Sequence, residues 1–261
     1  MLRLRDLVAC VAGYLLGSLP VGVWFGKAVR NIDVREHGSG STGTTNVLRT
    51  VGPGAAGAVF VLDVAKGSAA VGVARAMGCD RAAQAGAGVA AVVGHSWPVF
   101  AHLRGGKGVA TGYGGLLMLS GPGTATAMAG GLGALAATRI VSVGSMAACA
   151  GATVGTGAAA VRGRPGSGAA FAFALGACGL VVLRHRANIA RLMRGEEPRV
   201  SLGRRPDAGV GPTGADDPDH GARGADEGAS GANGRAGGRD LGETQAPASG
   251  PREATSTART G

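Results

Sequence analysis

The sequence predicts an all-α polytopic membrane protein with about seven transmembrane helices, an outside N-terminus and a disordered C-terminal tail. Long apolar runs rich in Ala, Gly and Val recur through the first 202 residues, with short cationic segments between them. Residues 203–261 contain almost no Leu, Ile, Val or aromatic residue, so they cannot bury enough apolar surface to offset chain entropy. We therefore divide the chain into a membrane domain, residues 1–202, and a disordered tail, residues 203–261.

The charge follows the same division. The whole chain carries a formal +10, of which the tail, with seven arginines and nine acids, contributes −2 and the membrane domain +12. Nucleic acid is not expected as a partner, because aromatic residues make up only 3% of the chain. In addition, the basic residues form no stripe within a segment whose pattern is that of a soluble protein. In a membrane protein the same excess is typical of cytoplasmic loops and phosphate sites.

The four cysteines, Cys10, Cys79, Cys149 and Cys178, are far apart and form no C-x-x-C pair. Neither a zinc site nor a redox pair is therefore predicted, and these residues are expected to act as small hydrophobes. We expect no metal and no cofactor.

The expected spans begin with the first apolar run. A hydrocarbon core of ~30 Å needs about 20 helical residues at ~1.5 Å each. No cleavage site of small residues ends the first run, so we expect an uncleaved span. Pro53 precedes the second run at the favoured first turn of a helix. The uninterrupted runs are Leu7–Phe25, Gly54–Val73, Ala82–Phe100, Met146–Val161 and Ala169–Leu183.

The stretch Gly112–Ala137 is interrupted by Gly121-Pro122-Gly123, a strong helix breaker. We predict two short helices that form a hairpin here, which brings the number of spans to seven. One continuous span would give six and would place the last polar motif outside.

The orientation follows from the basic residues. If the polar motifs share one side of the membrane, that side holds 14 Lys and Arg, and the other side holds 6. The positive-inside rule then places the motifs on the cytoplasmic side of the membrane.

The segment Gly38–Arg49, GSGSTGTTNVLR, is the first polar motif. Its glycines let backbone approach a ligand, its hydroxyls and amide supply directed hydrogen bonds, and Arg49 offers a planar fork for phosphate. The glycines match G-x-G-x-x-G, but no strand precedes them, and Thr44 stands where a P-loop needs lysine. We interpret the segment as a phosphate cradle at a membrane surface.

Two further features add charged groups. Asp63 and Lys66 lie three residues apart within the second apolar run, where ionisable groups are costly and are usually paired. They either neutralise each other or contact substrate. Lys107 stands among glycines in Gly105–Gly108 as a candidate phosphate-binding or carbonyl-polarising charge.

The last motif leaves the final apolar run. His185, Asn188 and Arg191 recur at three-residue intervals, which places them on one face of a helix. Gly195 is expected to end this helix, and Glu197 follows.

Together these segments resemble the bacterial acyl-phosphate:glycerol-3-phosphate acyltransferases, the PlsY family. The family pattern SGNxGATNxxR corresponds to Ser39–Arg49, GHxxPVFxxFxGGKGVAT to Gly94–Thr111, and RHxxNIxRLxxGxE to Arg184–Glu197. The family's D-x-x-K-G and its arginine-and-serine segment correspond to Asp63–Gly67 and Arg139–Ser145. The resemblance covers residues 7–200 and leaves out the tail.

Three positions depart from the pattern. Ser41 replaces an asparagine, Thr44 replaces an alanine, and Leu103 stands where the family often has phenylalanine. The loss of the asparagine amide weakens the case for a contact at position 41.

The resemblance implies transfer of a fatty acyl group from acyl-phosphate to the 1-hydroxyl of sn-glycerol 3-phosphate, without metal or acyl-CoA. The products are lysophosphatidate and phosphate, and an enzyme that makes acyl-phosphate is a possible upstream partner. From the motifs and the resemblance together, we expect catalytic roles for Ser39, Arg49, Lys107, His185 and Asn188. Substrate-binding roles are expected for Gly40, Thr45, Asn46, Asp63, Lys66, Gly105, Gly106, Ser142, Arg191 and Glu197.

Two questions stay open in the sequence. His185 is the natural general base by its ordinary pKa, whereas the resemblance implies that a substrate phosphate takes the proton. The alternative function is a multi-pass transporter of a phosphorylated metabolite, since broken helices and mid-membrane charges are also transporter features.

Overall fold

The computed structural model describes residues 3–200. Every regular element among these residues is a helix, and none is a strand. The predicted tail lies outside these residues. The helices are α1 (Leu4–Gly17), α2 (Val21–Arg30), α3 (Thr44–Thr50), α4 (Pro53–Ala76), α5 (Arg81–Ser96), α6 (Val109–Leu119), α7 (Gly121–Thr138), α8 (Val141–Val161), α9 (Ser167–Arg184) and α10 (Arg186–Met193). Two short 3₁₀ turns are η1 (Val34–Glu36) and η2 (Val99–Ala101).

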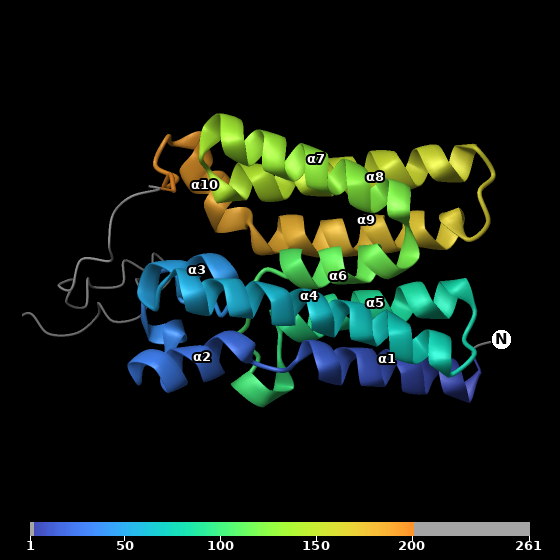
Figure 1. The fold of residues 1–261 in the computed structure, drawn as a ribbon, viewed down its shortest axis with the longest axis horizontal. Helices are drawn as coiled ribbons and strands as arrows, with labels where there is room; N and C mark the ends of the chain where they lie inside the picture. The colour runs from blue at the N-terminus through green and yellow to red at the C-terminus, as the bar shows by residue number, and fades with distance from the viewer. Residues whose placement is uncertain (1–2, 201–261) are drawn as a thin grey trace, which may run out of the picture. The chain divides into compact units, whose positions relative to one another are not determined.

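The longer helices lie alongside one another, and consecutive ones run in opposite directions (Figure 1). The short helices α2, α3 and α10 gather at one end of this bundle, the end from which α4 starts and at which α9 finishes. The polar motifs of the sequence therefore meet at that end.

Four segments in the described part of the chain are long and apolar enough to cross a membrane: Leu4–Arg30, Pro53–Ala76, Val141–Val161 and Ser167–Arg184. Helix α6 is apolar but shorter. The predicted class, an all-α membrane protein, is thus supported, and the number of seven spans stays a prediction.

The boundaries differ from the sequence prediction in two places. The first run is not one helix, because Pro20, which has no N–H to donate, separates α1 from α2. Helix α8 begins at Val141 and not at Met146, so Ser142 lies on its first turn. The arginine-and-serine segment is therefore largely helical.

The predicted split of the fourth apolar stretch is confirmed. Helix α6 ends at Leu119, and the Ser120 side chain caps α7 by accepting a hydrogen bond from Gly123 N (3.1 Å). Pro122 then sits in the first turn of α7, where its missing N–H removes no helical bond.

Small residues bring the helices close together. A Cβ added at Gly151 of α8 would collide with the Thr126 carbonyl of α7, and one at Gly13 of α1 would collide with the Ala87 carbonyl of α5. Such close approach replaces the hydrophobic drive that is absent between helices in lipid. This packing explains many of the chain's 51 glycines.

Candidate functional site

The centre of the site is Lys107, on the connection between α5 and α6. The two glycines before it are buried, and Gly106 N donates to the His95 carbonyl (3.0 Å) at the end of α5. From the other side Arg184 donates to the Gly106 carbonyl (3.2 Å) and to the Gly105 carbonyl (3.5 Å). The lysine is therefore presented from a backbone that is fixed on both sides.

A chain of polar contacts extends from Lys107 into the last motif. The Lys107 ammonium donates to Asn188 Oδ1 (2.5 Å), and Asn188 Nδ2 donates to Glu197 Oε1 (2.6 Å). Arg191 Nε donates to the second oxygen of the same carboxylate (2.9 Å). The Ser142 hydroxyl of α8 faces this carboxylate without a hydrogen bond of ordinary geometry. Three predicted site residues, Asn188, Arg191 and Ser142, thus face Glu197, and Asn188 connects this carboxylate to Lys107.

The ionisation of Glu197 reflects these partners. Burial alone would raise the pKa of its carboxyl, but Asn188, Ser142 and Arg191 outweigh burial and lower the pKa. Glu197 is therefore an anion at neutral pH and fixes Asn188 and Arg191 through hydrogen bonds. As predicted, Gly195 ends α10 with a positive φ of 72°, which turns the chain so that Glu197 folds back.

Burial lowers the pKa of Lys107 to about 8. The Glu197 carboxylate raises that pKa, while the positive charges of Arg191, Arg49 and Arg184 lower it further. Three arginines, from the first and the last motif, therefore lie within electrostatic range of Lys107. Such a concentration of positive charge favours a ligand with phosphate groups.

His185 lies at the break between α9 and α10 and is only 2% exposed. Its Nδ1 is 2.8 Å from the Val181 carbonyl, which fixes the proton on Nδ1 and leaves Nε2 as the acceptor. Burial, together with the charge of Lys107, lowers the pKa of His185 to about 4. The imidazole is therefore neutral at physiological pH.

The first motif is held together by Asn46. Its Oδ1 accepts from Ser39 N (2.9 Å), and its Nδ2 donates to the carbonyls of Val34 (2.7 Å) and His37 (3.0 Å). The Asn46 amide is therefore committed to shaping the loop, and its predicted contact with substrate stays a prediction. Gly40 has a φ of 66°, which a residue with a side chain rarely adopts.

The side chains of this motif that are accessible to a ligand are few. Ser39 and Arg49 are exposed, and Thr45 is half-buried in α3. Within residues 3–200 the Arg49 guanidinium makes no ion pair. Arg49 is thus available for an anion.

Asp63 and Lys66 form the ion pair that their spacing predicts, with Lys66 Nζ 2.8 Å from Asp63 Oδ1. Both side chains are almost fully buried within the bundle. The ion pair supports the prediction that Asp63 and Lys66 neutralise each other. Their direct contact with substrate stays a prediction.

Three residues that matter for the geometry were not predicted as site residues: Arg35, His95 and Arg184. Arg35 donates to the Ala101 carbonyl (2.9 Å) and so joins the connection before α3 to the connection before α6. His95 and Arg184 form hydrogen bonds with the Gly105–Gly106 backbone from opposite sides. Both belong to segments quoted above, Gly94–Thr111 and Arg184–Glu197, so their motif positions were the available signal.

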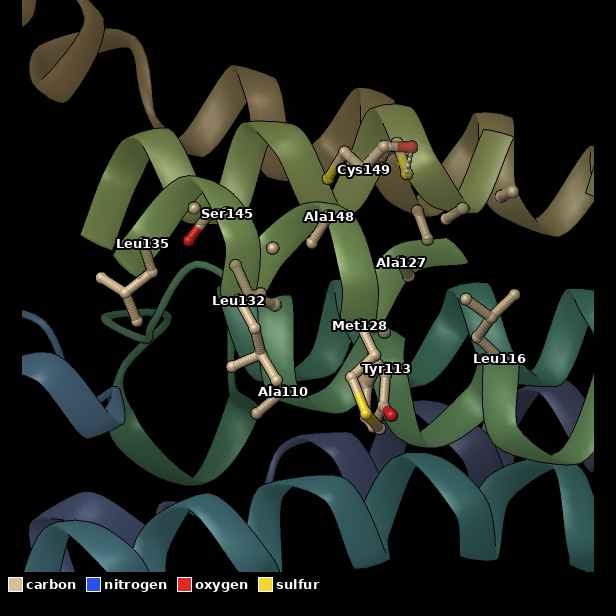
Figure 2. Close-up of a pocket in the computed structure, with 18 of the residues that line it drawn as sticks. Ala110, Tyr113, Leu116, Ala127, Met128, Leu132, Leu135, Ser145, Ala148 and Cys149 are labelled. Atoms are coloured by element: carbon tan, nitrogen blue, oxygen red, sulfur yellow. Dashed lines mark hydrogen bonds between the residues drawn. The ribbon is translucent and has the colours of Figure 1, made fainter. Parts of the chain in front are cut away.

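An apolar cavity of about 430 Å³ lies among α4, α6, α7, α8 and α9 (Figure 2). Its wall includes Ala110, Leu132, Ser145, Ala148 and Cys149, which Figure 2 shows around the same space. The cavity starts at Val109, two residues beyond Lys107, and extends to Ala152. An apolar space thus opens directly beside the cationic cluster.

In the described residues no three His, Cys, Asp or Glu side chains are grouped as metal ligands.

A family model described as glycerol-3-phosphate acyltransferase matches residues 7–195. The chain belongs to this family. It is 44% identical to the glycerol-3-phosphate acyltransferase of Synechococcus sp. (strain CC9902), over 76% of this chain and 96% of that protein. It is 46% identical to the one from Gloeobacter violaceus (strain ATCC 29082 / PCC 7421), over 72% and 92%.

A solved structure gives the same result. The crystal structure of PlsY (YgiH), an integral membrane glycerol 3-phosphate acyltransferase in its glycerol 3-phosphate form, superposes with a TM-score of 0.68. The identity is 34%, over 75% of this chain and 96% of that one. The protein is therefore an integral membrane glycerol-3-phosphate acyltransferase, and the transporter alternative is not supported.

Proposed function

We propose that this acyltransferase takes its acyl group from acyl-phosphate and transfers it to the 1-hydroxyl of sn-glycerol 3-phosphate. The observation that carries the proposal is the cationic cluster around Lys107 at the mouth of an apolar cavity. Both substrates bear a phosphate, and one bears a long alkyl chain, so this pair of environments suits them. The similar PlsY structures are described in a glycerol 3-phosphate form and a lysophosphatidic acid form.

In the proposed step, the 1-hydroxyl oxygen attacks the acyl carbonyl carbon and forms the ester bond. The bond from that carbon to the phosphate oxygen breaks, and phosphate leaves with its electron pair. We assign Lys107 to stabilise the negative charge that develops on the carbonyl oxygen. A donor placed in this way contributes about 3 kcal/mol to the transition state.

The hydroxyl proton needs an acceptor. The pKa of about 4 makes His185 a weak base, because a general base is most effective when its pKa lies near the working pH. We therefore assign the proton to an oxygen of the departing phosphate. His185 then acts through Nε2 as a neutral hydrogen-bond acceptor for the glycerol phosphate.

The remaining predicted residues fall into two groups. Arg49, Asn188 and Arg191 bind phosphate directly, with Ser39, Gly40 and Thr45 contributing donors from the first motif. Residues that act by holding these in place are Asn46, Gly105, Gly106, Ser142 and Glu197.

The cavity is assigned to the acyl chain. Along α8 it extends from Val141 to Ala152, ~16 Å at the helical rise of ~1.5 Å per residue. Burial of an alkyl chain contributes about 0.8 kcal/mol for each methylene. The chain therefore binds mainly through this space, and the carbonyl is left beside Lys107.

The enzyme is assigned to the bacterial inner membrane, with seven spans and the site facing the cytoplasm. The alternating direction of α1, α4, α5, α6, α7, α8 and α9 supports this assignment, since it puts all polar motifs at one end (Figure 1). The excess of basic residues at that end supports the cytoplasmic side. An enzyme that supplies acyl-phosphate is then expected on the same side.

The donor is tested directly with purified protein in detergent. Labelled glycerol 3-phosphate is supplied with acyl-phosphate, or with acyl-CoA of the same chain length. We expect lysophosphatidate only from acyl-phosphate, together with one phosphate for each product molecule. Lysophosphatidate from acyl-CoA alone would refute the proposed donor while leaving the family activity intact.

A further inference from the structure

A buried charged cluster lies beneath the connection that carries Lys107. It consists of Asp63 and Lys66 on α4 and His95 on α5, whose exposed fractions are 2%, 6% and 5%. Asp63 Oδ1 is 2.8 Å from Lys66 Nζ and 3.5 Å from His95 Nδ1. One carboxylate oxygen therefore faces both basic side chains.

The cluster joins several elements. Lys66 Nζ also donates to the Leu19 carbonyl (3.2 Å), in the break between α1 and α2. Burying charges is expensive, and breaking such a pair strongly destabilises a protein. Packing alone does not require this arrangement, since apolar side chains of similar volume would fill the same space.

The His95 end of the cluster touches the Gly105–Gly106 backbone. The His95 carbonyl accepts from Gly106 N (3.0 Å), and a Cβ at Gly106 would collide with His95 Nε2. A Cβ at Gly105 would collide with the His95 carbonyl. These two glycines thus pack closely against His95. The Arg184 guanidinium donates hydrogen bonds to their carbonyls.

We propose that His95, which faces the Asp63 carboxylate paired with Lys66, is a positioning residue for Lys107 in acyl transfer. This inference rests on the role given to Lys107 under the proposed function. The His95 imidazole packs against Gly106, beside the hydrogen bond between the two backbones, and Gly106 in turn sets where the Lys107 ammonium lies. Asp63 and Lys66 therefore act through this backbone and do not contact substrate.

The test is His95→Gln, with kcat/KM for glycerol 3-phosphate measured across pH. A displacement of about 1 Å near a reacting group costs about 100-fold in rate, so we expect a fall of that order. A released Lys107 is also better hydrated, so the alkaline limb moves from about pH 8 to higher pH. The other charges that act on Lys107, those of Glu197, Arg191, Arg49 and Arg184, are unchanged in this variant.

The matched control is His102→Gln, an exposed histidine seven residues further along the chain, in the connection between α5 and α6. It is expected to keep both the wild-type rate and the wild-type alkaline limb. A folded His95→Gln variant with wild-type kcat/KM would overturn the inference. A fall in rate with an unmoved alkaline limb would also overturn it, because a merely structural role produces that result.

Asp63→Asn provides a second route if His95→Gln does not fold. It keeps the side-chain volume and removes the charge that faces His95, so we expect the same direction in both measurements. Lys107→Ala separates the two proposals. If this variant stays active, the proposed role of Lys107 fails, whereas loss of activity there with a normal Asp63→Asn refutes only the positioning role.

Discussion

At Lys107, burial and the neighbouring arginines favour the neutral amine, and only Glu197 opposes them. The resulting pKa of about 8 keeps Lys107 mostly charged at neutral pH and leaves it close to its titration point. Asn188 connects the two charges, with Lys107 on one side and Glu197 on the other. The last motif must therefore fold back onto the connection before α6, because only then can Asn188 reach Lys107.

His185 gives a prediction in the opposite pH range. The folded protein holds it neutral down to about pH 4, whereas an unfolded histidine is protonated below about 6.5. Acid therefore destabilises the fold between these values as the pH falls. Since we do not assign His185 as the base, His185→Gln should keep the acidic limb of the kcat profile, with a loss of about 10–100-fold in kcat/KM.

His185→Ala is the companion variant, because it also removes the polar group that faces Val181. It should lose more activity than His185→Gln without moving the acidic limb. Disappearance of the acidic limb in His185→Gln would restore His185 as the general base.

At the scale of elements, the sequence predicted the ends of helices correctly where a local signal, such as a proline or a helix breaker, determines them. Pro53 at the start of α4 and Gly121-Pro122-Gly123 in the first turn of α7 are such signals, and both were predicted. The break at Pro20 was missed, because the apolar run continues through it and hydropathy does not register the missing N–H. The start of α8 was misplaced for a related reason, since Ser142 and Ser145 are polar in sequence but lie within the helix.

The site shows the same limit. Motif spacing predicted Lys107, Asn188 and Glu197 as members of one site, but their order of contact depends on how α10 and the residues after it fold back. His95 was missed as a site residue although it lies in the motif Gly94–Thr111, because its partner Asp63 lies on another helix. Contacts between distant segments cannot be obtained from the local pattern of a single sequence.

Helices α6, α7, α8 and α9 provide the element-scale prediction, since they enclose most of the cavity assigned to the acyl chain. Ala148→Leu adds bulk to the cavity wall, and we expect a higher KM for long-chain acyl-phosphate, with little change for a short chain (Figure 2). Each methylene displaced from the cavity costs about 0.8 kcal/mol, close to fourfold in affinity. Ala150→Leu, the same change at an exposed position of α8, is the control. Equal KM effects for both chain lengths would argue against the cavity.

At the scale of the whole molecule, the proposed orientation puts the two ends of the helices on opposite sides of the membrane. The start of α5 and helix α10 lie at opposite ends of the bundle (Figure 1). Ala82 is the second residue of α5 and Ala187 the second residue of α10, and both are exposed. Each is changed to cysteine in a chain whose own cysteines are replaced by serine. An impermeant maleimide should label Ala82→Cys in intact cells and Ala187→Cys only after permeabilisation. The reverse pattern would invert the orientation.

The central claim is that acyl transfer to glycerol 3-phosphate takes place around Lys107. The most direct measurement is phosphate release from acyl-phosphate by purified protein, with and without glycerol 3-phosphate, for wild type, Lys107→Ala and Lys27→Ala. Lys27 is the matched control, an exposed lysine on α2. We predict release that requires glycerol 3-phosphate, is equal in wild type and Lys27→Ala, and falls by about 100–1,000-fold in Lys107→Ala. Release that ignores glycerol 3-phosphate, or that survives in folded Lys107→Ala, would contradict the account.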